Sequence, residues 1–342
     1  MALPVDFARV LIGALDEPAI LVDQSRTLAA NAAARAVLGR HIEGNDVRLA
    51  LRHPQALQAV LSGKDQDFEL VGIGAADRPW LLTIRNVADG VRIVRLIDRS
   101  EARAAERMRV DFVANASHEL RTPLATIAGY AETLAEHAPV DDETRRGFGS
   151  TILGEARRML RIVQDLMSLS RIESERFVAP KDSVDLNEIV RLAADQAQPL
   201  CERQRCTIEL KLDESLPRLT GDFGQLLQTA ENLMTNAIRY GCTRAGCQVV
   251  VEVRRDGERA LLAVHDTGEG IAPEHLPRLT ERFYRVDAAR SRDSGGTGLG
   301  LAIVKHIVER HRGTLDIRSR PGGGTSVEIR LPLGPGVPSP LS

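Results

Sequence analysis

Two long series of apolar residues, spaced three or four positions apart, occupy the middle of the chain. Such spacing places apolar side chains along one face of a helix and is typical of a coiled-coil seam. A break near Pro139 separates the series, so they predict two long helices joined by a short loop. The first series contains Val113, Ala116, Leu120, Leu124, Ile127, Ala131 and Leu134, and the second contains Ile152, Ala156, Met159, Val163, Leu166 and Ser170.

A hairpin of two such helices has an apolar stripe that needs a partner. Two copies packed as a four-helix bundle would bury both stripes, which predicts a homodimer. Packing against another domain of the same chain is the alternative. Charged residues with little glycine or proline precede the first series, so residues 99–175 are expected to form a charged helical segment followed by the hairpin.

The first 98 residues alternate short apolar runs with turn residues, as small α/β modules do. Trp80 and Phe68 are interpreted as core residues rather than ligand contacts. The first strand ends at Asp23 and the next helix carries Asn31, an order that resembles a PAS sensor domain. The pattern predicts a turn at residues 24–26, a helix at 28–38, and strands at 19–23, 67–73, 80–86 and 91–97.

The region after Pro180 mixes helical and strand patterns, which predicts an α/β sandwich over residues 180–333. The last residues, 334–342, are rich in proline, glycine and serine and are expected to form a disordered tail. Helices are predicted at residues 185–204, 224–240 and 299–311, and strands at 207–212, 249–253, 260–264, 314–317 and 326–331.

The composition excludes several classes of protein. The 342 residues are 43% hydrophobic and 27% charged, which excludes wholesale disorder, collagen-like repeats and a disulfide scaffold. The formal charge of −2 argues against nucleic acid as a partner. The early apolar run at residues 10–15 is much shorter than the roughly 20 residues of a membrane span. We therefore expect a cytoplasmic chain, or the soluble part of a membrane-anchored sensor.

Four cysteines stand in the last part of the chain, Cys201, Cys206, Cys242 and Cys247. Neither pair has the two-residue gap of zinc knuckles, and no histidine lies at ligand spacing. A metal site is therefore disfavoured, and buried, reduced thiols are the expectation.

The sequence Ser-His-Glu-Leu-Arg-Thr-Pro lies within the first long helix and starts at Ser117. Apolar seam positions flank His118, so its imidazole is expected at the edge of the seam, where a neutral ring nitrogen is a competent nucleophile. Glu119 can hold the proton of the other ring nitrogen. Pro123 removes one helical hydrogen bond beside the histidine. An isolated His-Glu pair on a helix is more simply interpreted as a surface feature.

The last third of the chain supplies a matching candidate nucleotide site. Asn232 and Asn236 are four residues apart and lie on one helix face, where their amide oxygens suit Mg²⁺. Asp266 ends an apolar strand and can accept a hydrogen bond from an adenine amino group. A glycine-rich segment at residues 295–301 leads directly into a helix, an arrangement that favours polyphosphate. The segment matches neither a P-loop nor a Rossmann fingerprint.

Taken in order, these segments resemble the sequence boxes of bacterial sensor histidine kinases. The likeness covers roughly residues 100–333 and is nearest to the cytoplasmic part of phosphate-regulon-type sensor kinases. It implies a multidomain α+β chain: a PAS-like module, a dimeric four-helix bundle and a GHKL-type α/β sandwich. The boxes correspond to residues 118–123 (histidine), 232–240 (asparagine), 266–271 and 296–300 (glycine), 281–285 (phenylalanine) and 322–325 (Gly-Thr).

The resemblance also implies roles on the helical hairpin and the asparagine box. His118 would accept the γ-phosphoryl group of ATP, with Glu119 as general base. Thr122 would orient water during dephosphorylation of a partner aspartate. Asn236 would ligate Mg²⁺, with Asn232 beside it.

In the rest of the nucleotide site, Asp266 would anchor adenine, and Arg239 and Tyr240 would flank phosphate and base. Phe283 would seat the ATP lid on the core rather than touch the nucleotide. Glycines 268 and 270 would shape the adenine pocket, and glycines 296, 298 and 300 would belong to the lid. The remaining residues implied to bind nucleotide are Gly268, Gly270, Ile271, Gly296, Thr297, Gly298, Leu299, Gly300 and Thr325.

The implied activity is ATP-dependent autophosphorylation of histidine, followed by transfer to an aspartate of a response regulator, with phosphatase activity toward that regulator. An ATPase related to chaperones or DNA-repair proteins is a second hypothesis, but such relatives resemble only the last third of the chain. A non-catalytic sensor is a third. The input stays open: the first 200 residues lack the cysteine of a flavin–cysteinyl photosensor, and His41 and His53 could ligate haem or lie at the surface.

Overall fold

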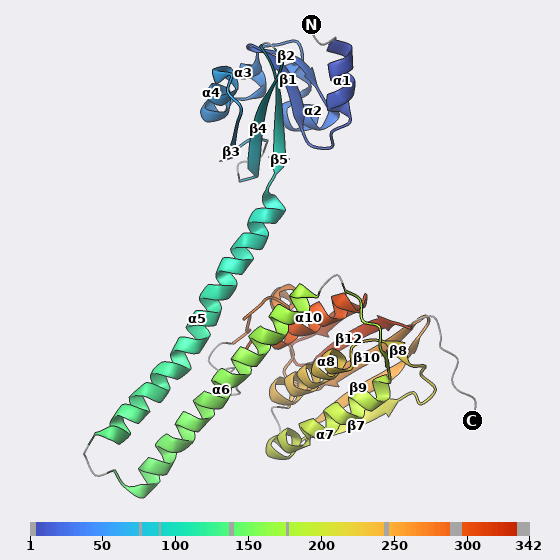
Figure 1. The fold of residues 1–342 in the computed structure, drawn as a ribbon. Coiled ribbons are helices and arrows are strands. Elements are labelled where there is room, and N and C mark those ends of the chain that lie inside the picture. The colour runs from blue at the N-terminus through green and yellow to red at the C-terminus, as the bar shows by residue number, and fades with distance from the viewer. Residues whose placement is uncertain are drawn as a thin grey trace. The chain divides into compact units, whose positions relative to one another are not determined.

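The computed structural model describes residues 5–74, 77–88, 90–136, 140–175, 178–242, 246–287 and 296–333. Backbone contacts divide the chain into two compact units, Met1–Ala114 and Asn115–Ser342. The division falls within one long helix, α5 (Ser100–Ala135), as the ribbon in Figure 1 shows. The predicted tail at residues 334–342 lies outside the described residues.

The first unit contains, within its described residues, a five-stranded antiparallel sheet with the order β2-β1-β5-β4-β3 and several short helices. The predicted α/β module is therefore present. Its elements are α1 (Val5–Gly13), β1 (Ala19–Asp23), β2 (Arg26–Ala30), α2 (Ala32–Leu38), η1 (Arg40–Ile42), α3 (Val47–Ala50), α4 (Pro54–Ser62), β3 (Gln66–Val71), β4 (Pro79–Ala88) and β5 (Val91–Asp98).

The start of the helix predicted at residues 28–38 is wrong. Residues Arg26–Ala30 form β2, which pairs with β1 so that Leu21 faces Ala29. The helix begins only at Ala32, after Asn31 has capped its first turn. Pairing with β1 outweighs the helix preference of an alanine-rich segment, because local propensity amounts to only tenths of a kcal/mol per residue.

Asn31 joins three segments of the first unit and is itself buried. Its Oδ1 accepts hydrogen bonds from the N–H groups of Ala19 (3.1 Å) and Ala34 (2.8 Å). Its Nδ2 donates to the carbonyl groups of Leu15 (3.0 Å) and Glu17 (2.8 Å). One side chain thus satisfies the backbone at the start of β1 and at the start of α2.

The core of this module is aliphatic around one aromatic side chain. Trp80 is 1% exposed, and its indole N–H donates to the carbonyl of Ile73 at 2.9 Å. Phe68 packs against the same cluster from β3. Both residues therefore contribute to the core, as predicted.

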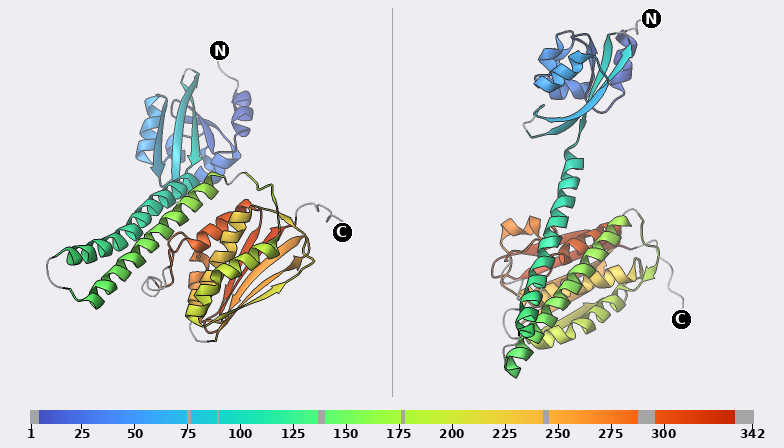
Figure 2. Two further views of the ribbon diagram at one scale, coloured as in Figure 1. Left: turned by 60° about the horizontal axis from the view of Figure 1, so that its bottom comes forward. Right: turned by 60° about the vertical axis from the view of Figure 1, so that its left-hand side comes forward.

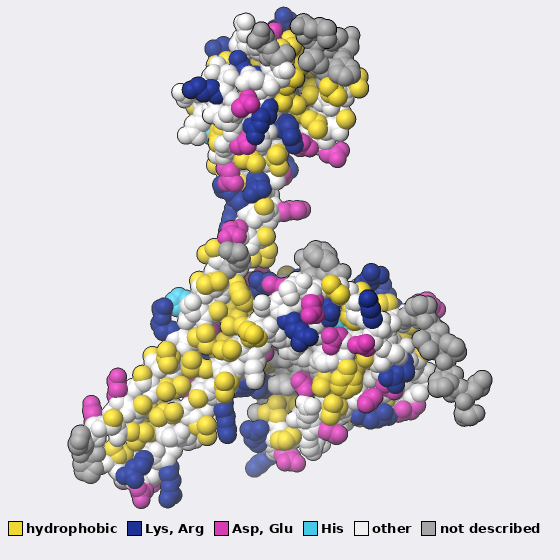
Figure 3. All heavy atoms as spheres, viewed as in Figure 1, with side chains coloured by type: hydrophobic (Ala, Val, Ile, Leu, Met, Phe, Trp, Pro, Cys, Tyr) yellow, Lys and Arg dark blue, Asp and Glu magenta, His cyan; other side chains and the backbone are white. Residues whose placement is uncertain are grey.

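The two predicted long helices are present as a hairpin of α5 and α6 (Asp142–Ser174). Asp141 caps α6 by accepting a hydrogen bond from the Thr144 N–H at 2.8 Å. Near the loop, Tyr130 and Phe148 bring their ring centroids within 4.8 Å, which ties the helices together. Much of the apolar stripe stays exposed, as Figure 3 shows along the hairpin, including Leu124, Leu153, Leu160, Val163 and Met167.

The rest of the second unit is an α/β sandwich, as predicted. In the described residues, its sheet has the order β11-β12-β10-β9-β7, and only the β7–β9 pair is parallel. Helices α7, α8 and α10 form a layer over one face of this sheet (Figure 2). The elements are β6 (Ser183–Val184), α7 (Leu186–Gln204), β7 (Thr207–Leu212), β8 (Leu219–Thr220), α8 (Phe223–Asn236), η2 (Ala237–Gly241), β9 (Gln248–Asp256), β10 (Arg259–Asp266), η3 (Pro273–Arg278), α10 (Gly300–Arg310), β11 (Thr314–Ser319) and β12 (Thr325–Pro332).

None of the helices in the described part of the chain combines the length and apolar character needed to cross a bilayer.

We predict that Asn31→Ala lowers the free energy of unfolding of the first unit by about 2–4 kcal/mol, because it removes four hydrogen bonds inside the fold. Asn31→Asp keeps the acceptor and should lose less. Denaturant unfolding followed by Trp80 fluorescence measures this, since Trp80 is the only tryptophan of the sequence. Asn45→Ala is the control, because it removes one exposed hydrogen bond to the carbonyl of His41. Equal unfolding midpoints for the Asn31→Ala and Asn45→Ala variants would contradict the prediction.

Candidate functional site

Asp266 lies at the end of the central strand β10, where its carboxylate is fixed from two sides. Oδ1 accepts hydrogen bonds from the N–H groups of Gly268 (2.9 Å) and Thr325 (3.1 Å). Burial raises the pKa of Asp266 above its usual value, while these two hydrogen bonds act in the opposite direction. The site therefore holds a partly desolvated carboxylate in one orientation.

Three glycines are needed for the backbone to close around this carboxylate. A Cβ on Gly241 would lie 2.3 Å from the Cβ and Cγ of Asp266, and a Cβ on Gly268 would lie 2.5 Å from the Cα of Gly241. Gly270 has a φ of +70°, and a Cβ there would lie 1.9 Å from the carbonyl oxygen of Arg320. Side chains at these positions would force the segments apart.

The same pocket extends to Ile271 and Thr325. The N–H of Ile271 donates to Ser319 Oγ at 2.8 Å, and the hydroxyl groups of Ser319 and Thr325 lie 2.9 Å apart. Both predicted residues therefore belong to the hydrogen-bonded end of the sheet that holds Asp266.

The asparagine helix ends differently from the sequence prediction. The α-helix α8 ends at Asn236, and residues Ala237–Gly241 continue as a π-helical turn that carries Arg239 and Tyr240. Such turns are rare and are frequent at functional sites. Burial and the charge of Arg161 lower the pKa of Arg239.

Asn232 connects α8 to the start of α10. Its Nδ2 donates to the carbonyl of Gly300 at 3.4 Å, and Gly300 is the first residue of α10. A Cβ on Gly300 would lie 3.5 Å from the Asn232 side chain, an ordinary contact. The N-terminus of α10, a favourable place for phosphate oxygens, therefore lies beside the predicted Mg²⁺-binding helix.

The second glycine box is held by the backbone of the phenylalanine box. The N–H of Phe283 donates to the carbonyl of Gly298 at 2.8 Å, and Gly298 has a φ of +74°. The N–H of Leu299 donates to Thr297 Oγ1 at 3.3 Å. Phe283 is thus bonded through its backbone to the second glycine box. Residues 288–295, which precede the box, lie outside the described residues.

His118 lies on α5 with its side chain exposed. Thr122 follows one turn later, also exposed, and its Oγ1 donates to the carbonyl of His118 at 3.3 Å. Glu119, the next residue, is half-buried, and its Oε2 accepts hydrogen bonds from Arg158 of α6 (3.1 Å) and from Arg285 (3.0 Å). His118 thus presents an exposed imidazole, and the adjacent Glu119 presents a carboxylate that is held by two arginine side chains.

Arg285 belongs to the phenylalanine box and joins two predicted parts of the site. Its Nη2 donates to Glu119 and also to the carbonyl of Gly296, at 2.6 Å. Beside it, Thr297 Oγ1 donates to Asp165 Oδ2 of α6 at 2.7 Å. The start of the second glycine box is therefore bonded to the helical hairpin, next to the residue that follows His118.

Two family models match the chain. The model of the histidine kinase-, DNA gyrase B- and HSP90-like ATPases matches residues 221–335, and that of the His Kinase A (phospho-acceptor) domain matches residues 108–175. The sensor-like histidine kinase SenX3 of Mycolicibacterium smegmatis is 35% identical over 305 residues, covering 86% of this chain and 78% of that protein. This chain belongs to the two-component sensor histidine kinases.

Other histidine kinases show the same similarity. The phosphate regulon sensor protein PhoR of Pseudomonas aeruginosa is 39% identical over 247 residues, which cover 72% of this chain but 54% of that protein. The structure of full-length ShkA in complex with AMPPNP is 26% identical, with a TM-score of 0.50, and covers 69% of this chain and 47% of that one. The Acinetobacter baumannii histidine kinase AdeS has the same fold, with 24% identity, a TM-score of 0.52, and coverage of 64% of this chain and 98% of that one.

Among the residues that connect the parts of this histidine kinase site, Arg158 and Asp165 belong to no predicted motif. Arg158 is 8% exposed through its side chain, although it lies on a helix rich in charged residues. No motif surrounds either position. Their partners, Glu119 and Thr297, are 39 and 132 residues away in sequence, so only the tertiary structure reveals them.

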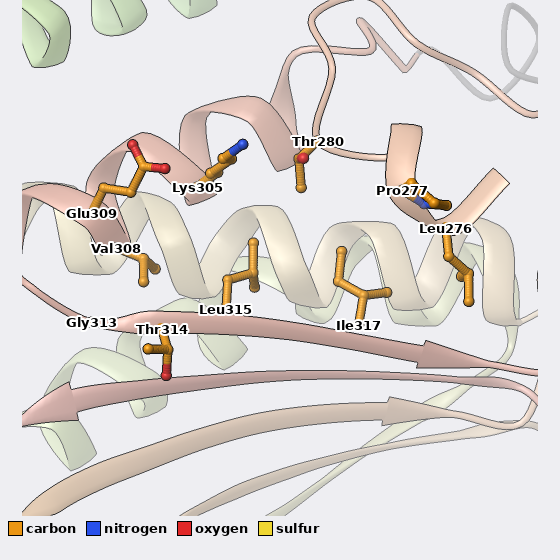
Figure 4. Close-up of a pocket in the computed structure, with 10 residues that line it drawn as sticks. All are labelled: Leu276, Pro277, Thr280, Lys305, Val308, Glu309, Gly313, Thr314, Leu315 and Ile317. Atoms are coloured by element: carbon orange, nitrogen blue, oxygen red, sulfur yellow. The ribbon is translucent and has the colours of Figure 1, made fainter. Parts of the chain in front are cut away.

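Two surface cavities, of about 550 and 540 Å³, open on the ATPase-type domain of the kinase. The first lies between η3, α10 and β11, where it is lined by Lys305 of α10 and by Leu315 and Ile317 of β11 (Figure 4). None of the predicted nucleotide residues lines it. The second is bordered by Asp266 and Thr325, so it reaches the predicted adenine end of the site.

The expectation of reduced thiols is wrong for one cysteine pair. Cys242 and Cys247 form a disulfide with a Cα–Cα distance of 5.4 Å, and Cys247 is only half-buried. Cys201 and Cys206 are free and buried. Burial, together with the neighbouring Cys206 thiol, raises the pKa of Cys201 to about 12. The π-helical turn brings Cys242 back toward the start of β9, a return that the sequence pattern did not predict.

We predict that Gly241→Ala weakens binding of adenine nucleotides by the kinase by roughly 10- to 100-fold, because its Cβ displaces Asp266 and strain of this kind costs about 1–3 kcal/mol. Titration with a fluorescent ADP analogue measures the affinity. Gly224→Ala in α8 is the matched control, since its Cβ would lie 3.6 Å from Asp222 Oδ1, an ordinary contact. Equal affinities for the two variants would show that this close approach does not constrain the pocket.

Proposed function

We propose that this chain autophosphorylates His118 with Mg-ATP and passes the phosphoryl group to an aspartate of a response regulator. The observation that carries the proposal is the position of Arg285. One guanidinium group contacts Glu119, the neighbour of His118, and Gly296, the start of the glycine box. A single side chain therefore contacts both α5, the helix that carries His118, and the start of the second glycine box.

His118 has the properties of a phosphoacceptor. Its ring is exposed, so a γ-phosphate can approach it without displacing packed side chains. Both arginines hold Oε2 of Glu119, and we assign the other oxygen, Oε1, to the ring proton of His118. A carboxylate on that proton fixes the tautomer and increases the nucleophilicity of the opposite ring nitrogen.

In the nucleotide site, we assign Asp266 to the adenine amino group, and Arg239 and Tyr240 to phosphate and base. The glycine-box residues Gly296, Thr297, Gly298, Leu299 and Gly300 would supply backbone N–H groups to the phosphates at the N-terminus of α10. Gly268, Gly270, Ile271 and Thr325 would form the adenine end. These assignments rest on the hydrogen-bonded arrangement around Asp266 and on the contact between Asn232 and Gly300.

Asn236 fits the Mg²⁺ ion that the proposed reaction requires. Among the described residues its amide has no hydrogen-bond partner, and it is half-buried at the end of α8. An amide oxygen is a suitable ligand for this hard cation, and Asn232 lies one turn away. When bound, the ion would neutralise charge on the phosphate oxygens.

The proposed reaction exchanges one bond to phosphorus for another. A ring nitrogen of His118 forms an N–P bond to the γ-phosphorus while the bond to the β-phosphate oxygen breaks, and ADP leaves. Glu119 takes the proton from the other ring nitrogen. Such transfers depend mainly on positioning and charge neutralisation, which the arginines and backbone N–H groups can provide.

Two further parts of the proposal concern the regulator. The exposed face of α5 around His118 and Thr122 would be its docking surface. Thr122 lies one turn from His118 with its hydroxyl at the helix surface, where it could orient a water molecule toward a phosphorylated aspartate. We therefore propose that the chain also dephosphorylates its regulator.

We further propose that the chain acts as a homodimer. The hairpin exposes apolar side chains of both helices, among them Leu124, Leu153 and Met167 (Figure 3). A second hairpin would cover this stripe and complete a four-helix bundle. The proposed domains are a PAS-like sensor at 1–98, signalling helix and hairpin at 99–175, and an ATP-binding domain at 180–333.

Labelling with [γ-³²P]ATP tests the proposed function. We expect acid-labile, base-stable label on the unmodified chain and none on His118→Gln. Glu119→Gln should slow labelling by about 10²- to 10⁴-fold, the usual contribution of a general base. His41→Gln, an exposed histidine in the first unit, is the matched control and should label normally. Hydrolysis of ATP without label on the protein would instead support a plain ATPase.

A second prediction follows from the partly buried carboxylate of Asp266. Because burial raises the pKa of Asp266, it should protonate at a higher pH than an ordinary aspartate. Protonation removes the acceptor for adenine, so ATP affinity should fall as pH decreases through this raised pKa. The free energy of unfolding of the nucleotide-free domain depends on pH in the opposite way. Because the pKa of Asp266 is higher in the folded state, its contribution to stability is present at low pH and is lost as pH rises through that pKa.

Asp266→Asn should weaken ATP binding by roughly 10- to 100-fold and remove this pH dependence, because a hydrogen bond to a charged group contributes about 1.5–3 kcal/mol. Calorimetric titration at several pH values measures both effects. Asp256→Asn, at the exposed far end of β9, is the control. An unchanged pH profile in Asp266→Asn would contradict the assignment of the adenine anchor.

A further inference from the structure

All four cysteines of the sequence meet at one corner of the ATP-binding domain. Cys201 lies in the last turn of α7, and Cys206 directly precedes β7. Cys242 follows the π-helical turn, and Cys247 directly precedes β9. The parallel pairing of β7 with β9 aligns Thr207 with Gln248, so the preceding residues Cys206 and Cys247 lie side by side.

The backbone fixes this meeting point. The N–H of Thr207 donates to the carbonyl of Cys247 at 3.1 Å, and the N–H of Cys206 donates to the carbonyl of Cys201 at 3.0 Å. Gly246, with a φ of +81°, provides the turn that leads into Cys247. The backbone positions of the four cysteines are thus fixed by the ends of helices and strands.

The sulfur atoms are correspondingly close. The sulfurs of Cys206, Cys242 and Cys247 all lie within 4.8 Å of one another, and Cys242 and Cys247 are joined as a disulfide. Cys201 lies outside this group of three but adjoins it, because its carbonyl accepts the hydrogen bond from the Cys206 N–H. Three of the four residues are buried, and Cys247 is half-buried.

A disulfide accounts for only two of these sulfurs. Together with Cys201, whose backbone is bonded to Cys206, the three clustered sulfurs would supply the donor set of a tetrahedral thiolate site, in which Zn–S bonds of about 2.3 Å place the sulfurs about 3.8 Å apart. The sequence has the matching signal: each pair is separated by four residues, within the range of zinc-binding cysteine pairs. We propose that Cys201, Cys206, Cys242 and Cys247, in reduced form, bind one Zn²⁺ ion.

The disulfide and the metal exclude each other, because both use Cys242 and Cys247. Two molecules of a small thiol reduce the disulfide: two electrons and two protons yield two cysteine thiols, and the small thiols become a disulfide. Binding of Zn²⁺ then forms four Zn–S bonds and releases four protons to solvent. Exchange with a small-molecule disulfide would reverse this: Cys242 and Cys247 form their disulfide, the small molecule is reduced to two thiols, and the ion leaves as Cys201 and Cys206 take up protons.

The site adjoins the proposed ATP pocket. Cys242 follows Gly241, whose backbone packs against Asp266, and the N–H of Cys242 donates to the carbonyl of Ile238 at 3.3 Å. The metal would therefore hold the end of the asparagine helix against β7 and β9. This consequence rests on the proposed function, whereas metal binding itself does not.

Titration of the full chain with Co²⁺ tests the site. After reduction with a phosphine and removal of the reductant without oxygen, we expect one equivalent of Co²⁺ to give thiolate-to-cobalt charge transfer and the intense visible bands of tetrahedral coordination. One equivalent of Zn²⁺ should abolish both. Chain with the disulfide intact should show neither until it is reduced. Reduced chain without these bands in excess Co²⁺ would overturn the proposal.

Variants identify the ligands. Cys247→Ser, at the least buried position, and Cys201→Ser should each lower Co²⁺ affinity by roughly tenfold or more and weaken the charge-transfer band. His265→Gln, a ligand-type residue on neighbouring β10, is the control and should bind normally. Full band intensity in Cys201→Ser would overturn the four-sulfur site. Because the spectrum reports coordination independently of ATP, failure of the metal site is distinguishable from failure of the kinase proposal.

Discussion

The close approach of three backbone segments around one partly buried carboxylate is the constraint on which the ATP-binding domain depends. Gly241, Gly268 and Gly270 leave no room for side chains, and Asp266 fills the remaining space with its two hydrogen bonds. This packing fixes where the π-helical turn meets the sheet. It therefore also fixes Asn236, Arg239 and Cys242, which lie on either side of Gly241 in the chain. A single steric requirement thus sets the positions of the groups that we propose to bind adenine and phosphate, together with the position of the Cys242 thiol.

Hydrophobic periodicity predicted most of the fold because each element carries its own pattern. The long hairpin and the helices and strands of the sandwich show the expected spacing. Residues 28–30 were mispredicted because alanine and leucine fit a helix or a buried strand equally well, and only pairing with β1 decides between them. The π-helical turn was missed for a related reason: its widened hydrogen bonding leaves no signal in the spacing of Leu233, Ala237 and Tyr240.

The motifs of the site were predicted from the sequence, but not the contacts that connect them. Glu119 was predicted as a base from its place beside His118, whereas its two arginine partners lie far away in sequence. Arg158 is buried on a helix whose composition predicts exposure. The cysteines show the opposite case. Both cysteine pairs have the same four-residue gap in the sequence, which is longer than the two-residue gap of zinc knuckles. Only the register of β7 with β9 shows that the two pairs meet.

The first turns of α5 are bonded to the sheet of the first unit, through Arg103 and Glu69, and Arg78 with Asp98 holds the strand end just before them. From there α5 runs without a break to Ala135 and carries His118 on the way. Each residue of an α-helix turns the chain by about 100°. Within the second unit, His118 and Thr122 are four residues apart on α5 and therefore face nearly the same way, whereas Glu119 lies about 100° around the helix, where α6 and Arg285 reach it. One residue inserted between His118 and Thr122 would turn the Thr122 hydroxyl by about 100° away from the imidazole.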